Sequence, residues 1–400
     1  MRIGIDASRA NLLKKTGTEW YAFHLIRALF TALKPEDEVI LYLKEEPLSD
    51  WGALPENFKF KILKWPPRFL WTLIRLSLEM VINPVDLLFV PAHIVPFFCP
   101  QKTITTLHDI GFEHSKELYG QKSIGKSGLL KHLLNFLVRF FTLGKYGANE
   151  YDYHRFSARL ALSKSQRILT VSEFSKQDII QTYKIDPGRV SVVPNAVDFS
   201  RFNETIRENP NKIAEIQANL DLVRPYLMAL GRIEKKKNSL GLVKAFKILR
   251  QDIQFKNYKL LLVGTFGLGS EEVFEKIKEY NLSDQVICPG WIKAEYLPYV
   301  LAGAEAFVMP SFFEGFGVPV LEAMAVGTPV VCSNTASLPE VVDDSGMLVE
   351  PSDPNSICQG IKTVLTDQGL KSRLVQSGYK RAKLFSWEKS GQKLAEIIFG

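Results

Sequence analysis

Short apolar runs, each followed by a segment long enough for an amphipathic helix, recur from one end of the 400-residue chain to the other. Runs of Val, Ile and Leu that are separated by helices are typical of buried strands in a parallel sheet. Two series of such runs stand on either side of a polar stretch, Ser200–Asp221. The pattern therefore predicts two doubly wound α/β domains, each built around one sheet.

A chain of this length exceeds what one hydrophobic core usually supports, which also favours two domains. We place the first domain at 1–205 and the second at 206–380, with the boundary in the polar stretch. The predicted strands are Arg2–Asp6, Glu38–Leu43, Phe60–Leu63, Leu87–Val90, Thr103–Leu107, Ile168–Val171 and Val190–Val193, then Tyr226–Leu230, Lys259–Val263, Val286–Cys288, Ala306–Met309, Pro329–Val331 and Met347–Val349.

The composition is that of an ordinary folded protein, with 46% apolar and 23% charged residues. The four cysteines stand apart from one another, which argues against a disulfide framework and a structural zinc site and for a reducing compartment. No run reaches the ~18–20 apolar residues of a membrane span, and the N-terminus is typical of a strand rather than a signal peptide. We therefore expect a cytoplasmic protein that is not integral to a membrane.

The net charge of +7 is concentrated in one segment. Between Lys116 and Arg167 there are ten Lys and Arg against three Asp and Glu, a surplus of seven that equals that of the whole chain. Such a segment suits an anionic lipid or a phosphorylated substrate, or it is a solvated face. Charge alone also permits a nucleic-acid enzyme, but no recognition motif supports one.

Two cations follow the strand predicted at Tyr226–Leu230. Gly231 and Arg232 come directly after it, and Lys237 comes five residues later. Ligands in open α/β sheets bind beyond the carboxyl ends of the strands. Arg232 and Lys237 are therefore placed to hold a diphosphate there, unless they belong to a basic surface turn.

A second group follows the strand predicted at Ala306–Met309. A loop with Glu314, Gly315, Phe316 and Gly317 leads into a helix that carries Glu322. Glycines let backbone amides approach an anion, and the helix N-terminus adds partial positive charge. The two carboxylates can accept hydrogen bonds from sugar hydroxyls at different parts of one ligand.

These motifs together resemble the donor site of the group 1 (family 4) retaining glycosyltransferases. The first half of the chain extends the resemblance, with Thr106 to Asp109, Val171 to Lys176 and Pro194 to Asp198 in the order that the family shows. The resemblance implies the GT-B fold, in which two Rossmann-like doubly wound parallel-sheet domains face each other across a cleft. It also implies that a closing segment, 381–400, crosses back to the first domain.

The resemblance assigns roles to individual residues. Arg232 and Lys237, beside Gly231, would bind the donor diphosphate and stabilise the leaving group, and Glu322 would bind the ribose hydroxyls. Glu314 and the amides of Gly315, Phe316 and Gly317 would hold the transferred sugar and the distal phosphate. His108 would lie at the floor of the cleft, and Gly17 would approach the phosphates. Family members need no metal and no cofactor beyond the nucleotide sugar, and the chain has no Asp-x-Asp motif.

The activity that the resemblance implies is transfer, with retention, of a hexose of the mannosyl or glucosyl type from a nucleotide-diphosphate sugar. The acceptor would be a saccharide or a lipid-linked saccharide in cell-surface polysaccharide or glycoconjugate synthesis. Two alternatives are a nucleotide-sugar epimerase of the same fold and a non-catalytic binding protein. The sequence argues against a dehydrogenase, because no GxGxxG follows the first strand.

Two features of the first half depart from the family pattern. Many relatives carry two glycines in the first loop, whereas Glu19 stands here where the second is common. An insertion at about 120–150 opens with a phosphate-loop match, 120–127, but no buried strand precedes that match, so its context fails. The amphipathic stretch 129–141 predicts either a helix packed on its own domain or on a dimer partner, or a helix that holds 126–145 against an anionic membrane on the inner face of the cell membrane.

Overall fold

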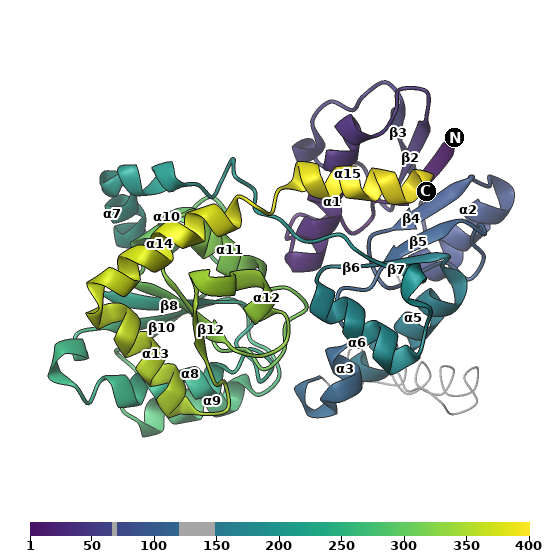
Figure 1. Ribbon diagram of the computed structural model, residues 1–400. Helices are drawn as coiled ribbons and strands as arrows, with labels where there is room; N and C mark the ends of the chain where they lie inside the picture. The colour runs from purple at the N-terminus through teal and green to yellow at the C-terminus, as the bar shows by residue number, and fades with distance from the viewer. Residues whose placement is uncertain (66–69, 120–148) are drawn as a thin grey trace. The chain divides into compact units, whose positions relative to one another are not determined.

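The computed structural model describes residues 1–65, 70–119 and 149–400. The chain forms two units, of which the first is Met1–Asn195 with Trp387–Gly400 and the second is Ala196–Ser386. Each unit has one parallel sheet with helices on its faces (Figure 1). All thirteen predicted strands are present within the described residues, with ends that differ from the predicted ones by two residues at most.

The sheet of the first unit has seven strands in the order β3-β2-β1-β4-β5-β6-β7, and every pairing is parallel. Its strands are β1 Arg2–Asp6, β2 Glu38–Leu43, β3 Phe58–Ile62, β4 Leu87–Val90, β5 Thr103–Thr106, β6 Arg167–Thr170 and β7 Val190–Val192. Its described helices are α1 Gly17–Ala32, α2 Leu76–Ile82, α3 Gly111–His114, α5 Glu150–Lys164, α6 Glu173–Tyr183 and α15 Trp387–Phe399.

The sheet of the second unit has six parallel strands in the order β10-β9-β8-β11-β12-β13. These strands are β8 Tyr226–Leu230, β9 Lys259–Val263, β10 Val286–Gly290, β11 Ala306–Met309, β12 Val330–Ser333 and β13 Met347–Val349. The helices are α7 Pro210–Asn219, α8 Ser239–Leu249, α9 Ser270–Glu279, α10 Leu297–Gly303, α11 Val318–Ala325, α12 Leu338–Val342, α13 Pro354–Thr366 and α14 Gln368–Ala382.

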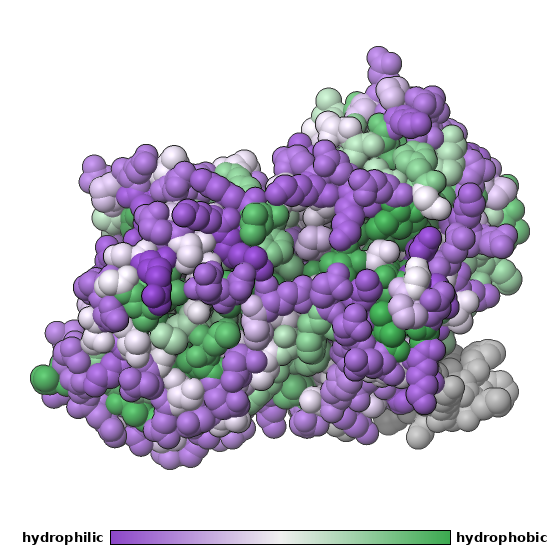
Figure 2. Space-filling model, in the orientation of Figure 1, coloured by the Kyte–Doolittle hydropathy of each residue, from purple (hydrophilic) through white to green (hydrophobic). Residues whose placement is uncertain are grey.

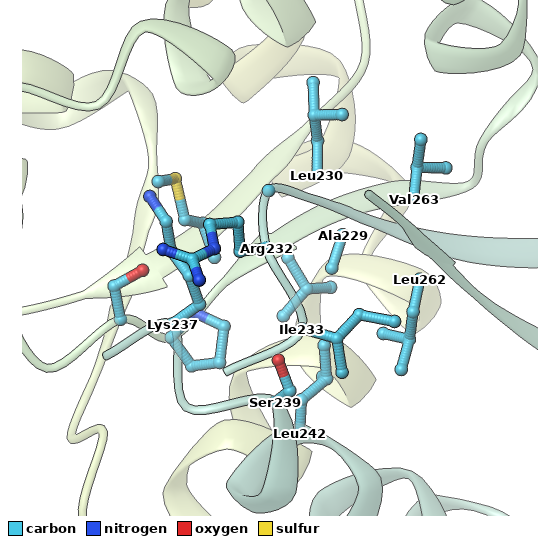
Figure 3. Close-up of a pocket in the computed structure, with 14 residues that line it drawn as sticks. Ala229, Leu230, Arg232, Ile233, Lys237, Ser239, Leu242, Leu262 and Val263 are labelled. Carbon is cyan, nitrogen blue, oxygen red and sulfur yellow. The ribbon is translucent and has the colours of Figure 1, made fainter. Parts of the chain in front are cut away.

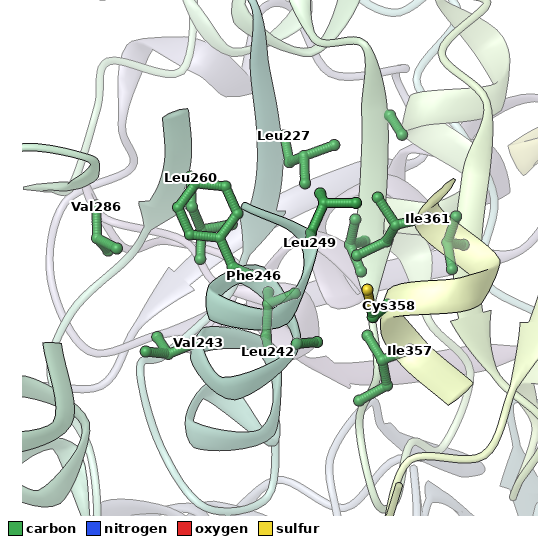
Figure 4. Packing of buried hydrophobic residues seen from close by; sticks show 14 of the residues in the cluster. Leu227, Leu242, Val243, Phe246, Leu249, Leu260, Val286, Ile357, Cys358 and Ile361 are labelled. Carbon is green, nitrogen blue, oxygen red and sulfur yellow. The ribbon is translucent and has the colours of Figure 1, made fainter. Parts of the chain in front are cut away.

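One part of the core of the second unit lies between this sheet and helices α8 and α13. Phe246 and Leu249 of α8 and Ile361 of α13 pack together with strand residues such as Leu227 and Leu260, and all five are buried (Figure 4). Burial on both faces explains why the strands read as continuous apolar runs rather than as alternating ones. The prediction of two doubly wound domains is thus confirmed.

The division between the units falls at 195/196, earlier than the predicted 205/206. The residues between these points already belong to the second unit, where the Arg201 guanidinium donates to the Ala294 carbonyl at 2.7 Å. The chain returns to the first unit at Trp387, later than the predicted 381, because α14 continues to Ala382 on the second unit.

Helix α15 completes the first unit by packing on α1. Gly391 lies so close to Ala28 that a Cβ at position 391 would come within 2.6 Å of the Ala28 Cβ. The Ser390 hydroxyl donates to the Pro194 carbonyl at 2.9 Å. A small residue at 391 is therefore what allows the two helices to approach.

A close contact between two glycines shapes the carboxyl edge of the second sheet. Gly264, which follows β9, has φ +140°, and a Cβ there would overlap the carbonyl oxygen of Gly231. Gly231 in turn donates its amide to the Val263 carbonyl at 2.9 Å. The turn after β8 therefore depends on the absence of a side chain at 264.

We predict that Gly264→Ala lowers the free energy of unfolding by about 3 kcal/mol or more, because the backbone at Gly231 must shift in addition to the φ strain. Gly290→Ala is the matched control, since Gly290 has φ +74° but open space around its Cβ position, so only a strain cost of about 1 kcal/mol applies. Urea unfolding of both variants measures the difference, and equal losses would contradict the contact.

Candidate active site

A pocket opens at the carboxyl edge of the second sheet, between β8 and β11 (Figure 3). The chain order of the sheet reverses here, since β9 and β10 lie on one side of β8 and β11 to β13 on the other. Ligands of open α/β sheets bind at such a switch point. The pocket is lined by Ala229, Leu230, Gly231, Arg232, Ile233, Lys237, Ser239, Leu242, Leu262, Val263, Val308, Met309, Pro310 and Ser311.

The two predicted cations, Arg232 and Lys237, both line this pocket, as does Gly231. Gly231 has φ +139°, a conformation that L side chains rarely adopt, and a Cβ there would meet the Lys237 side chain at 3.2 Å. The structure therefore places Gly231 directly beneath the lysine stem. Figure 3 shows the Arg232 and Lys237 side chains close to each other over the turn.

Each cation has a carboxylate partner. The Lys237 ammonium donates to Glu314 at 2.6 Å, and that carboxylate is almost buried. The Arg232 guanidinium lies 3.4 Å from Glu234, whose pKa is raised by burial. Arg232 is half exposed, so its charge remains accessible to an anion in the pocket. The ion pair with Lys237 brings predicted Glu314 to the same site.

The loop that carries Glu314 is fixed by one buried serine. The Ser337 hydroxyl lies 2.9 Å from the carbonyl of Glu314 and 3.1 Å from that of Phe316, within hydrogen-bonding reach of both. Gly317, with φ +104°, begins helix α11, and a Cβ there would meet Leu338 at 2.5 Å. Phe316 is buried against the ring of Phe385, 5.5 Å between centroids. Together with Gly315 these residues form one rigid turn, and their contact with a ligand stays a prediction.

Glu322 lies in the second turn of α11, on the same strand–loop–helix segment but outside the lining of the pocket. Burial raises the pKa of its carboxyl to about 7, an effect that Arg201 opposes and Asp198 reinforces. The folded chain therefore holds the Glu322 proton up to a higher pH than an exposed glutamate would. A carboxylate kept in such surroundings is ready to accept hydrogen bonds from hydroxyl groups.

The other two predicted site residues, His108 and Gly17, belong to the first unit. His108 follows β5, and its ring meets the edge of Tyr21 at 4.8 Å. Its Nε2 is buried without a hydrogen-bond partner among the described residues, and burial lowers its pKa to about 4. His108 is therefore a neutral imidazole at physiological pH.

Gly17 is the first residue of α1, and a Cβ there would meet nothing within 4 Å. Glu19, the residue that departs from the family pattern, closes a capping box in which its carboxylate accepts the Thr16 amide at 3.0 Å. It also lies 3.6 Å from the Arg9 guanidinium. Glu19 thus stabilises the start of α1.

Sequence reasoning missed Ser311. It follows Pro310 directly after β11, lines the pocket with Arg232 and Lys237, and is only 1% exposed. Its hydroxyl has no partner within the described part of the chain, whereas buried hydroxyls are normally hydrogen-bonded. The sequence did carry one signal for Ser311, its position just after a predicted strand. Only the structure shows that its hydroxyl lacks a hydrogen-bond partner among the described residues.

Among the described residues, no group of three or more His, Cys, Asp or Glu side chains is arranged to hold a metal ion. No helix in that part of the chain is both long and apolar enough to cross a bilayer. The phosphate-loop match 120–127 and the amphipathic stretch 129–141 lie outside the described residues.

Comparison with known families covers both units. Residues 16–201 match the model described as Glycosyltransferase Family 4, and residues 212–381 match the model described as Glycosyl transferases group 1. The chain belongs to the group 1 glycosyltransferases. The family predicted from the Arg232–Lys237 and Glu314–Glu322 motifs is confirmed.

Among the relatives of this chain is the O-antigen chain mannosyltransferase B of Escherichia coli, 33% identical over 63% of this chain and 65% of the relative. A second is an N-acetylgalactosaminyltransferase of Campylobacter jejuni whose name specifies a diphospho-undecaprenol-linked acceptor, 28% identical over 62% of this chain and 64% of the relative. The chain thus spans less than two thirds of the length of these relatives.

Solved structures share the fold over nearly the entire chain. Sucrose-phosphate synthase of Thermosynechococcus elongatus superposes with a TM-score of 0.71 at 20% identity, over 99% of this chain and 98% of that one. Anabaena HepE, solved with UDP-glucose, gives 0.71 at 17% identity over 100% and 99%. The GT-B fold of this chain is therefore confirmed, whereas the cleft between the units stays a prediction.

We predict that Glu322→Gln makes the protein more stable than the wild type above pH 7 and not below about pH 4.5. The pKa of Glu322 is raised to about 7 in the folded chain from about 4.3 in the unfolded one. The folded state thus binds the proton more tightly, and the stability this contributes is lost as the pH rises through 7. The expected difference at pH 8.5 is up to about 3.7 kcal/mol, because each pKa unit corresponds to about 1.36 kcal/mol.

Urea unfolding of the variant and the wild type at pH 8.5 and at about pH 4.5 measures this difference in stability. Glu295→Gln is the control, because Glu295 is 70% exposed. A Glu322→Gln variant whose advantage over the wild type is the same at both pH values would contradict the raised pKa.

Proposed function

We propose that this protein transfers a hexosyl group from a nucleotide-diphosphate sugar to a saccharide or lipid-linked saccharide, with retention of configuration and without a metal ion. The observation that carries the proposal is the pocket at the switch point of the second sheet, where Arg232 and Lys237 converge over the Gly231 turn. Two fixed cations at that point suit a diphosphate. Glu314, 2.6 Å from Lys237, adds a carboxylate for sugar hydroxyls.

The chemistry follows from where charge develops. Cleavage of the bond between the anomeric carbon and the phosphate oxygen leaves an oxocarbenium-like sugar and a diphosphate with added negative charge. Arg232 and Lys237 would stabilise that charge, in the role that a divalent cation fills in metal-dependent transferases. Glu322 would accept hydrogen bonds from the ribose hydroxyls, and the Gly315 to Gly317 turn would face the transferred sugar and the distal phosphate.

Retention requires that the acceptor attack the face from which the diphosphate departs. We assign the acceptor proton to the departing phosphate oxygen, because the lowered pKa of His108, about 4, makes its imidazole a weak base. His108 would instead contact the sugar through its unsatisfied Nε2. Gly17, at the start of α1, would approach the phosphates.

The names of relatives support the substrate classes. The Escherichia coli relative is named as a mannosyltransferase of the O-antigen chain, and the Campylobacter jejuni relative as acting on a lipid diphosphate. HepE was solved with UDP-glucose. A mannosyl or glucosyl donor and an acceptor in cell-surface polysaccharide or glycoconjugate synthesis fit these names. Such an acceptor would place the protein in the cytoplasm, peripheral to the inner face of the cell membrane, with 126–145 facing anionic lipid.

The test is a panel of UDP-, GDP- and ADP-sugars assayed with the full chain for slow donor hydrolysis and for thermal stabilisation. Hydrolysis that continues in the presence of EDTA supports a metal-independent reaction. Release of a sugar with the anomeric configuration of the donor supports retention. Isomerised donor without acceptor supports an epimerase instead. Stabilisation by a nucleotide with no turnover supports the non-catalytic alternative.

We predict that Arg232→Ala and Lys237→Ala each lower kcat/KM for the preferred donor by ~100-fold, or roughly 3 kcal/mol of transition-state stabilisation. Lys293→Ala is the control, since Lys293 is a 70% exposed lysine of the same unit. Near wild-type kinetics in both pocket variants would refute the diphosphate assignment.

We predict that Ser311→Ala lowers kcat/KM for the donor by about tenfold, because a hydrogen bond to a charged phosphate oxygen is worth about 1.5 kcal/mol or more. The midpoint of thermal unfolding should stay the same or rise, since the hydroxyl has no partner among the described residues to lose. A lower midpoint with unchanged kinetics would mean that Ser311 is structural.

A further inference from the structure

One face of helix α2 presents apolar side chains to solvent. Leu78, Val81 and Ile82, at i, i+3 and i+4, share that face and are 45%, 63% and 69% exposed. The opposite side of the same helix is buried through Leu76 and Met80 in the core of the first unit. A helix that is apolar on both sides is normally covered on both.

The loop 96–99 widens this apolar surface. Phe97 and Phe98 are 40% and 65% exposed. The amide of Phe98 donates to the Ser77 hydroxyl at 3.2 Å, which fixes the loop beside α2. We call the five residues Leu78, Val81, Ile82, Phe97 and Phe98 the α2 surface. Figure 2 shows hydrophobic residues at the edge of the molecule where Figure 1 draws α2.

Basic residues border the α2 surface. The single acid of α2, Glu79, is buried and forms ion pairs with both Lys61 and Arg75, so this group of three keeps a net positive charge. Lys164 is exposed, and its carbonyl lies 4.0 Å from the Cys99 sulfur, next to Phe98 in sequence.

We propose that the α2 surface inserts into the interface of an anionic phospholipid bilayer. Exposed apolar side chains bordered by lysine and arginine match such an interface in both polarity and charge. A second copy of the chain is a poorer partner, because a twofold contact would bring the positive border against itself. The proposal rests on the proposed membrane location and assigns it to residues other than 126–145.

The test is co-sedimentation of the full chain with phosphatidylcholine vesicles, with and without phosphatidylglycerol. We expect binding that needs phosphatidylglycerol and weakens at raised ionic strength. Val81→Glu/Ile82→Glu should weaken that binding by about tenfold or more. Val223→Glu/Ile253→Glu is the matched control, since these residues of the second unit have the same types and are 60% and 75% exposed; it should bind as the wild type does.

The outcomes separate the proposal from the rest of the function. Equal binding by the α2 double variant and the wild type overturns the proposal, most clearly if Lys131→Glu/Arg139→Glu abolishes binding instead. A wild type that dimerises through Val81 and Ile82 in sedimentation velocity and ignores vesicles also overturns it. Donor hydrolysis is measured on every variant: its retention in the α2 double variant shows that the transferase is intact, and its absence from the wild type refutes the proposed activity alone.

Discussion

The Lys237 ammonium and the Glu314 carboxylate, 2.6 Å apart, join the loops that follow β8 and β11. The carboxyl ends of parallel strands lie at the same edge of a sheet, so these two loops meet at that edge. The chain order of the sheet reverses between the neighbouring strands β8 and β11, which leaves the space between their loops open to a ligand. The ion pair fixes that separation while leaving the ammonium beside the pocket. Because Glu314 is nearly buried, loss of the lysine would leave an uncompensated carboxylate, and the two loops would lose their common anchor.

The fold was predictable from sequence because burial on both faces of a parallel strand leaves a mark that needs no knowledge of its neighbours. The cations after β8 were also predictable. Once the strands are located in the sequence, their carboxyl ends mark where ligands bind. The boundary was less so: Arg201 reads as part of a polar connection, and only its bond to the Ala294 carbonyl shows that it belongs to the second unit. The unsatisfied hydroxyl of Ser311 likewise depends on its surroundings in the fold, which a linear pattern does not give. The capping role of Glu19, by contrast, is a Thr-x-x-Glu pattern that the sequence carries at positions 16 to 19.

Two site residues illustrate how one physical cause shifts pKa values in opposite directions. Burial favours the neutral form of both His108 and Glu322, which lowers the pKa of the histidine and raises that of the glutamate. Neither shift has a counterpart in the sequence motifs, which predict that the residues are present but not which protonation state they hold. A polar ligand that displaced solvent and supplied hydrogen bonds would change this balance at Glu322, whose pKa lies near physiological pH.

Helix α15 gives the first unit a segment that comes from the far end of the chain. During synthesis, Ala196–Ser386 emerges as one continuous stretch and has all its strands before α15 is made. In the first unit, by contrast, the side of α1 around Ala28 packs on α15. That side stays uncovered until Trp387–Phe399 has left the ribosome. The domain made first is therefore the one that is finished last.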